Sequence, residues 1–170
     1  MSIFGKHLSP YAMLSISGLL AVSDQAVKWL VQQSMAYGES ISVTSFFNWV
    51  HVWNTGAAFS LFANDGGWQR YFLIGIAVVV SIVLIVLIRT NRNKEEAIAY
   101  SLILGGATGN LIDRIFRGYV VDSFDFYWRS WHWPAFNLAD VVIVLGALLF
   151  ISVSLLGDKT NNNAEPDGSD

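Results

Sequence analysis

The feature that most restricts how this chain can fold is an uncharged apolar run over residues 71–88, YFLIGIAVVVSIVLIVLI. A helix needs about 20 mostly apolar residues to cross the hydrocarbon core of a bilayer. Three further segments come close to that length and composition, at residues 11–31, 97–112 and 136–157. Charged residues make up 14% of the 170-residue chain, against about 25% in a soluble domain. The pattern predicts a mainly α-helical membrane protein, a bundle of four transmembrane helices.

The last segment, residues 158–170, differs from the rest of the chain. It reads DKTNNNAEPDGSD, and its four acidic residues and one lysine account for the whole net charge of −3. A polar tail of this kind has nothing to bury, so we expect it to be disordered. Residues 1–157 then form a single integral-membrane domain.

Composition also excludes several classes of function. The sequence has no basic patch of the kind that binds nucleic acid, and we expect no nucleic-acid partner. It contains no cysteine, which rules out thiol nucleophiles, disulfides and cysteine-ligated metals.

The orientation of the spans follows from the basic residues between them. The link RTNRNKEE, residues 89–96, holds three bases within six residues, and the positive-inside rule places such a link in the cytoplasm. With four spans, both termini are then also cytoplasmic. Arg114, Arg117 and Arg129 run against this rule, because they fall in or next to the loop that follows the third span on the outer side.

The outer segment between the first and second spans, residues 38–67, is rich in β-branched and aromatic residues. Its partial alternation of apolar and polar residues predicts short strands, with turns at residues 54–56 and 64–67. We expect a small β-sheet here, between the first two helices. Aromatic rings are favoured at the membrane surface, so this sheet is expected to rest on membrane lipids and to help cover a cleft.

Small residues are concentrated in the third span, where GGATG covers residues 105–109. Such a run could be taken for a phosphate-binding loop. Inside an apolar span it is far more typical of a helix that packs closely against its neighbours. We therefore interpret Gly105, Gly106 and Gly109 as packing positions.

Ionisable and amide side chains gather at the outer ends of the spans. Asp24 and Lys28 are spaced i, i+4 and can pair, which lowers the cost of both in lipid. Asp113 and Arg114 fit a helix cap and an interface anchor as well as they fit a functional site. Asp140 has no base nearby on its own segment, so it needs a partner elsewhere, and the acids of the outer loop, Asp122 and Asp125, lie at the same depth.

Two carboxyl groups held close together cannot both ionise cheaply, so they share one proton. One can then act as a base that activates water and the other as an acid, which is aspartic-protease chemistry. A zinc site is disfavoured because the three histidines form no HExxH pair. A catalytic Ser–Lys dyad would have to use Lys28, but Ser23, which is near it in sequence, points to a different helix face. Carboxylates could instead hold Mg²⁺ for lipid phosphate chemistry, but no repeated D-x-x-D pattern supports this.

Five motifs occur in a fixed order along the chain: SDQAVK at 23–28, NTGAAFS at 54–60, GGATGNLIDR at 105–114, GYVVD at 118–122 and FNLAD at 136–140. Together they closely resemble the bacterial lipoprotein signal peptidases, also called signal peptidase II. The resemblance extends over about residues 11–157. Ser123 is a departure, because the family usually has a bulky apolar residue after the GYVVD aspartate.

The resemblance implies an aspartic endopeptidase of the cytoplasmic (inner) membrane, with its active site on the periplasmic side. It implies cleavage of prolipoproteins on the amino side of a diacylglyceryl-modified cysteine, without metal or cofactor, and inhibition by globomycin. Carried over by motif, Asp122 and Asp140 are the catalytic pair, although Asp125 is close enough to be confused with Asp122. The residues expected to bind substrate or support the site are Asp24, Lys28, Asn54, Gly56, Asn110, Asp113, Arg114, Asn137 and Ala139.

Three other functions remain to be distinguished from this one. A small transporter would use Asp140 in a relay, although the polar residues occupy one side and no repeated halves are visible. A membrane scaffold would use the acids only as helix caps. A metal-dependent lipid transferase would lose its activity to a chelator. Four spans suffice for a monomer, which is the oligomeric state we expect.

Overall fold

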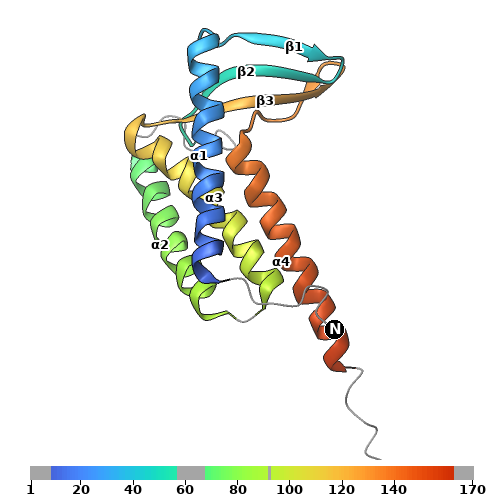
Figure 1. The fold of residues 1–170 in the computed structure, drawn as a ribbon. Coiled ribbons are helices and arrows are strands. Elements are labelled where there is room, and N and C mark those ends of the chain that lie inside the picture. Colours follow the sequence, from blue (N-terminus) through green and yellow to red (C-terminus); the bar gives the residue numbers. More distant parts are fainter. Residues whose placement is uncertain (1–8, 57–67, 92, 163–170) are drawn as a thin grey trace, which may run out of the picture.

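The computed structural model describes residues 9–56, 68–91 and 93–162, which form four helices side by side with one four-stranded sheet across an end of them (Figure 1). The helices are α1 (Pro10–Ser34), α2 (Trp68–Thr90), α3 (Lys94–Phe116) and α4 (Leu138–Asn162). The strands are β1 (Ser40–Thr44), β2 (Phe47–Asn54), β3 (Val120–Trp128) and β4 (Trp131–His132). The fold is therefore mainly helical with a small antiparallel sheet, as the sequence predicts.

Local sequence signals account for the helix ends. Ser9 caps α1 by accepting a hydrogen bond from the backbone N–H of Ala12, and Pro10 follows it at the first helical position, where a missing N–H costs nothing. Asn93 caps α3 and accepts from the N–H groups of Glu95 and Glu96. The negative charges of these two acids in the first turn also interact favourably with the positive end of the helix dipole.

Each predicted span coincides with a helix that differs from it by a few residues at either end. Among the described residues, α2 and the part of α4 from Leu138 to Leu156 are long and apolar enough to cross a membrane. α4 continues to Asn162, five residues into the tail predicted to be disordered. Residues 163–170 lie outside the described residues, and their disorder stays a prediction.

The outward faces of the helices are apolar. In α2, Leu84 and Ile88 are buried, whereas Val79, Ile82 and Val86 are each more than half exposed. A continuous apolar surface of this kind is unfavourable in water and marks a face that meets lipid or another apolar partner. The helices thus carry the surface expected of a membrane protein.

Close packing explains the small residues of the third span. A Cβ atom at Gly106 would collide with the carbonyl oxygen of Ala139 on α4, and one at Gly109 would lie 2.6 Å from Asp24 Oδ2 on α1. Gly105 likewise faces Leu20 of α1, where a Cβ atom would come within 2.8 Å of Leu20 Cβ. The packing interpretation of GGATG is confirmed: these glycines let α1 and α4 approach α3.

The sheet is larger than the one expected from the first outer segment alone. β1 and β2 come from that segment, but the order β1-β2-β3-β4 adds two antiparallel strands from the connection between α3 and α4. Placing the whole sheet between the first two helices was therefore wrong. β2 needs a hydrogen-bonded neighbour on its second side, and β3 supplies it through pairs such as Val52 with Asp122.

The predicted turn at residues 54–56 is confirmed. Gly56 has a φ of 98°, which a residue without Cβ adopts readily, and its N–H donates to Asn54 Oδ1 over 2.9 Å. The second predicted turn, at residues 64–67, lies outside the described residues.

Two contacts fix the sheet to the helices. Val31 and Met35 near the end of α1 pack with Val121 of β3, and Met35 O is hydrogen-bonded to His51 Nδ1 of β2 over 3.0 Å. At the start of α4, the N–H groups of Ser123 and Phe124 donate to Phe136 O over 2.9 and 2.8 Å. The residues that begin α4 are therefore held directly beside β3.

Candidate active site

The two acids proposed from the sequence lie at the end of the bundle that the sheet covers. Asp122 is the third residue of β3, and Asp140 is in the first turn of α4. Asp122 is 2% exposed. An antiparallel β-bridge between Phe124 of β3 and Phe136, just before α4, brings these two elements together.

Asn137 joins the two carboxyl groups. Its side-chain Nδ2 donates to Asp122 Oδ1 over 2.7 Å, and its backbone N–H donates to Asp140 Oδ2 over 3.3 Å. Asn137 Oδ1 accepts in return from the backbone N–H of Asp140 over 3.1 Å. This reciprocal arrangement caps the start of α4 in the manner of a capping box, so FNLAD both begins the helix and aligns the two acids.

Each carboxyl group receives a second amide from another part of the chain. Asn54 Nδ2 on β2 donates to Asp122 Oδ2 over 3.1 Å. Asn110 Nδ2 on α3 donates to Asp140 Oδ1 over 2.9 Å. The two acids are thus held by neutral donors, which orient them without adding charge.

The surroundings of Asp122 favour its protonated form. Burial raises the pKa of Asp122 to about 6, and the charge of Asp140 raises it as well. Hydrogen bonds from Asn137 and Asn54, and the charge of Lys28, oppose this rise. A pKa near 6 allows the group to give and take a proton close to neutral pH.

Lys28 lies at the centre of a buried polar cluster behind the two acids. Its side chain is fully buried, and its Nζ lies 2.7 Å from Asp24 Oδ2, 3.0 Å from Asp113 Oδ2 and 2.9 Å from Asn110 Oδ1. The i, i+4 pair with Asp24 is confirmed. The additional contacts show that Lys28 is also bound to α3, through Asn110, which in turn holds Asp140.

Asp113 is part of this cluster and is fully buried. Its Oδ2 accepts from the backbone N–H of Val121 over 3.1 Å, and its Oδ1 accepts from Gln25 Nε2 over 2.9 Å and from Arg117. Of the two readings left open for Asp113, the contacts favour a place in the site, because the side chain connects α3 to α1 and to β3.

Arg114 points differently from Asp113. Its side chain is half-buried and makes a 3.4 Å contact to the backbone oxygen of Asn110. Its guanidinium also interacts electrostatically with the carboxylates of Asp140, Asp113 and Asp122. Its own backbone oxygen accepts from Arg70 Nε over 2.7 Å. Arg114 is thus a cation close to the two acids.

The remaining predicted residues act through their backbone. The N–H of Ala139 donates to Asp24 Oδ1 over 2.9 Å, and its fully buried small side chain stands where α4 meets Gly106. Gly56 orients Asn54 through the turn described above, and a Cβ atom there would lie 2.6 Å from Leu73 Cδ1. The structure thus brings every predicted site residue into one region.

Asp125 is separated from the two acids by its place in the strand. It is three residues from Asp122 and therefore on the other face of β3. It accepts from Asn48 Nδ2 over 2.8 Å and is paired with His132 Nδ1 over 2.9 Å. Ser123 is also fully buried, and its hydroxyl has no hydrogen-bond partner among the described residues.

Sequence reasoning missed Gln25 and Arg117 as members of the cluster. Arg117 is spaced i, i+4 from Asp113, a spacing that indicates a pair on a helix. Gln25 gave no such signal, because it lies beside Asp24 on the chain and reaches Asp113 only through the packing of α1 on α3.

Comparison with known proteins agrees with this geometry. The family model described as signal peptidase (SPase) II matches residues 16–156. The chain belongs to the signal peptidase II family. A lipoprotein signal peptidase of Serratia marcescens is 84% identical over 170 residues, which is the full length of both chains. A lipoprotein signal peptidase of Actinobacillus succinogenes is 46% identical over 160 residues, covering 92% of this chain and 98% of the relative.

Solved structures show the same fold. A bacterial membrane enzyme determined at 2.3 Å resolution superposes with a TM-score of 0.77 at 29% identity, over 91% of this chain and 93% of its own. A second, at 1.9 Å resolution, superposes with a TM-score of 0.75 at 30% identity, over 86% and 94%. Membership of the signal peptidase II family makes the chain a peptidase, and the apolar helices α2 and α4 agree with a membrane enzyme.

Proposed function

We propose that this member of the signal peptidase II family is an aspartic endopeptidase whose catalytic pair is Asp122 and Asp140. Its substrates are prolipoproteins, cut on the amino side of a cysteine that carries diacylglycerol. The observation that supports this most directly is that Asn137 is hydrogen-bonded to both carboxyl groups, to Asp122 Oδ1 through its side-chain amide and to Asp140 Oδ2 through its backbone N–H. A pair held this way can act on one peptide bond.

The mechanism follows from a shared proton. In the resting enzyme one carboxyl is ionised and the other holds the proton, because two adjacent charges are costly. The ionised group takes a proton from a water molecule, whose oxygen attacks the carbonyl carbon of the scissile bond. The protonated group gives its proton to the carbonyl oxygen, which leaves a neutral tetrahedral diol. The carboxyl that took the proton from water then gives it to the leaving nitrogen as the C–N bond breaks, and one hydroxyl of the diol returns its proton to the other carboxylate, so that the pair again holds one proton.

Arg114 provides positive charge on the same side of the bundle. Because it feels the charges of both Asp122 and Asp140, it favours ionisation of one member of the pair. A guanidinium there also suits a backbone carbonyl of the substrate, to which it can donate. We assign Arg114 a role in binding substrate next to the pair.

We infer that all four helices cross the cytoplasmic membrane. α1 and α3 carry the buried cluster of Asp24, Lys28 and Asp113, whose charges are compensated within the bundle, as intramembrane ions require. The last turn of α2, which holds Arg89, and the start of α3, at Lys94, are at the end of the bundle away from the sheet (Figure 1). The positive-inside rule places that end in the cytoplasm, so both termini are cytoplasmic and the sheet and active site are periplasmic.

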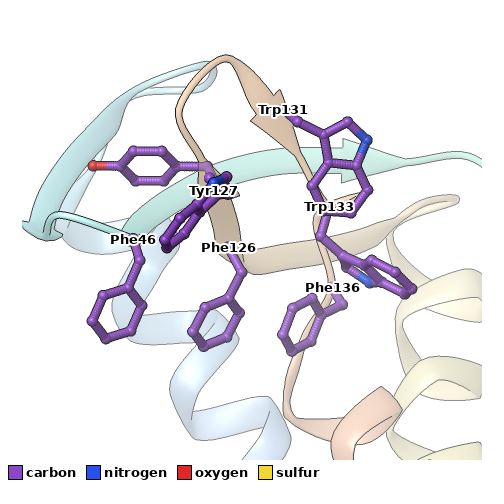
Figure 2. A pocket seen from close by; sticks show the side chains of 7 residues that line it. Phe46, Phe126, Tyr127, Trp131, Trp133 and Phe136 are labelled. Atoms are coloured by element: carbon purple, nitrogen blue, oxygen red, sulfur yellow. The ribbon is translucent and has the colours of Figure 1, made fainter.

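The aromatic side chains of the sheet support contact with membrane lipids. They surround a pocket of about 400 Å³ and come from the β1–β2 turn, from β3 and β4, and from the link between β4 and α4: Phe46, Phe126, Tyr127, Trp128, Trp131, Trp133 and Phe136. The rings of Phe46, Phe126 and Phe136 project from the sheet toward the side on which the helices lie (Figure 2). Such rings are favoured in the headgroup region of a bilayer.

The substrate and this orientation fit each other. The acyl chains on the modified cysteine stay in the outer leaflet, and the signal helix crosses the bilayer. The scissile bond is thereby held near the outer surface, at the depth of Asp122 and Asp140. Holding a substrate in place in this way can remove several kcal/mol from the barrier.

Incubation of the purified protein with a diacylglyceryl-modified prolipoprotein tests the proposal. We expect cleavage before the modified cysteine, no cleavage of the unmodified precursor, and no effect of EDTA. Asp122→Asn and Asp140→Asn each abolish cleavage while leaving the protein folded. Asp125→Asn is the matched control and stays active, because Asp125 lies on the other face of β3.

Other outcomes favour the other functions. Cleavage by either dyad variant moves the chemistry to other residues, and loss of cleavage in Asp125→Asn alone moves it to Asp125. Sensitivity to EDTA indicates a metal-dependent enzyme, and an Asp140-dependent ion flux in liposomes indicates a transporter. Inhibition by globomycin and a monomeric mass in detergent are further expectations of the same proposal.

A further inference from the structure

Asp113 is linked to each of the two proposed catalytic acids through its neighbours. Its Oδ2 accepts from the N–H of Val121, the residue before Asp122 in β3. The same oxygen is 3.0 Å from Lys28 Nζ. Lys28 also holds Asn110 Oδ1, and Asn110 Nδ2 donates to Asp140. Short chains of contacts therefore lead from one carboxylate oxygen to both members of the pair.

The other oxygen of Asp113 is held by two residues. Gln25 belongs to the motif SDQAVK, and Arg117 lies between the motifs GGATGNLIDR and GYVVD. Gln25 Nε2 donates to Asp113 Oδ1 over 2.9 Å and to the backbone oxygen of Gly109 over 3.0 Å. Gln25 Oε1 accepts from Arg117 over 2.8 Å, and Arg117 is also paired with Asp113 Oδ1. The donor and acceptor ends of Gln25 are thus both used, which fixes the orientation of its amide.

Charge points to the same arrangement. Asp24 and Asp113 are the buried carboxylates of the cluster, and Lys28 and Arg117 are their cations. Lys28 is fully buried, whereas the side chain of Arg117 is 24% exposed. Without Arg117 the cluster would carry an uncompensated negative charge, and Asp113 would be free to draw Lys28 away from Asn110. Uncompensated charges in a buried cluster are the ones that force rearrangement.

We propose that Gln25 and Arg117 are positioning residues for peptide-bond cleavage. They hold Asp113 Oδ1, so that Asp113 Oδ2 keeps β3 and Lys28 in the places that align Asp122 with Asp140. This inference rests on the proposed catalytic pair. It differs from a purely stabilising role, in which Gln25 and Arg117 would only join α1 to α3.

The test measures kcat and KM of Arg117→Gln, Arg117→Lys and Gln25→Leu on a diacylglyceryl-modified prolipoprotein, with each rate expressed per folded protein. We expect Arg117→Gln and Gln25→Leu to lower kcat by roughly ten- to a hundredfold, the range for a small misplacement of reacting groups, with KM nearly unchanged. Arg117→Lys, which keeps the charge, recovers part of kcat. Arg129→Gln, an exposed arginine in the β3–β4 turn, is the matched control and leaves both constants unchanged.

The double variant Gln25→Leu/Arg117→Gln separates positioning from stability. Since both residues act through Asp113 Oδ1, we expect the kcat of the double variant to be close to the lower of the two single-variant values. It should lie well above the kcat expected if the two fold-losses multiplied. A wild-type kcat in folded Gln25→Leu or Arg117→Gln overturns the inference, as does a loss confined to thermal stability. If Arg117→Gln does not fold, Gln25→Leu and Arg117→Lys decide.

Failure of this inference is distinguishable from failure of the proposed function. Asp122→Asn and Asp140→Asn are measured in the same assay. If they cleave, the catalytic pair is wrong. If they are inactive while the Gln25 and Arg117 variants keep the wild-type kcat, the pair stands and only the positioning role falls.

Discussion

Asn137 donates its side-chain amide to Asp122 over 2.7 Å, from the cap position of α4 to the third residue of β3. The same side chain accepts from the N–H of Asp140 through its oxygen. One residue therefore starts a helix and sets the relation between the two proposed catalytic acids. The two roles can be separated by mutation.

Asn137→Ser keeps an oxygen that can cap α4 but removes the amide that reaches Asp122. We expect cleavage to fall by up to about a hundredfold, as for other small misplacements of reacting groups, with little change in thermal stability. Asn137→Ala removes the cap as well and should cost about 1 kcal/mol of further stability. Rates on a lipid-modified precursor and thermal unfolding in detergent measure the two effects, and a fully active Asn137→Ser variant would contradict the bridging role.

The pKa of Asp122 predicts how stability depends on pH. Burial raises this pKa from 3.8 to about 6, so between these values the folded protein binds a proton that the unfolded chain has released. Stability from this group is therefore greatest below about pH 4 and declines as the pH rises to about 6, by about 3 kcal/mol in all. Asp122→Asn should lack this decline, which unfolding of both proteins between pH 4 and 7 measures.

Asn54 offers a check on the same group. Its hydrogen bond stabilises the ionised form of Asp122 and so lowers the pKa. In Asn54→Ala the pKa of Asp122 should rise further, and the decline in stability should extend to a higher pH. If the decline in stability with rising pH is the same in the wild type and in Asp122→Asn, the titrating group is another acid.

Lys28 compensates two buried carboxylates, so its removal should be costly. Lys28→Met leaves Asp24 and Asp113 without their ammonium, a change expected to destabilise the fold by about 3–5 kcal/mol. Lys28→Met/Asp24→Asn should recover part of that loss, because one of the unpaired charges is gone. Thermal unfolding of the three proteins measures this, and an equal loss in the single and double variants would argue against charge as the cause.

Gly106 determines how closely α4 approaches α3 beside Asp140. In Gly106→Ala the new methyl group meets the carbonyl of Ala139, so α4 has to shift, and we expect both stability and cleavage to fall. Gly75→Ala is the matched control, because a Cβ atom there meets no atom within 4 Å and alanine favours a helix by up to about 1 kcal/mol. Equal effects at the two glycines would mean that contact with α4 is unimportant.

Much of this arrangement is readable from the sequence because its causes are local. Four mostly apolar segments predicted the four helices, and the capping residues Ser9 and Asn93 stand where two of them begin. Asp24 and Lys28 pair because an i, i+4 spacing places them on one helix face. The motifs around Asp122 and Asp140 indicated the family and the two acids.

The sequence alone determined which polar residues stand in apolar segments, where lipid or a protein core disfavours them. Only the tertiary structure decided which of them meet. β3 was not foreseen as a sheet strand, since its pairing with β2 joins segments some seventy positions apart. Gln25 gave no signal because its partners, Gly109 and Asp113, come within reach only when α1 packs on α3. Hydrogen bonds form wherever packing brings donors to acceptors, and spacing along the chain reports only those within one element.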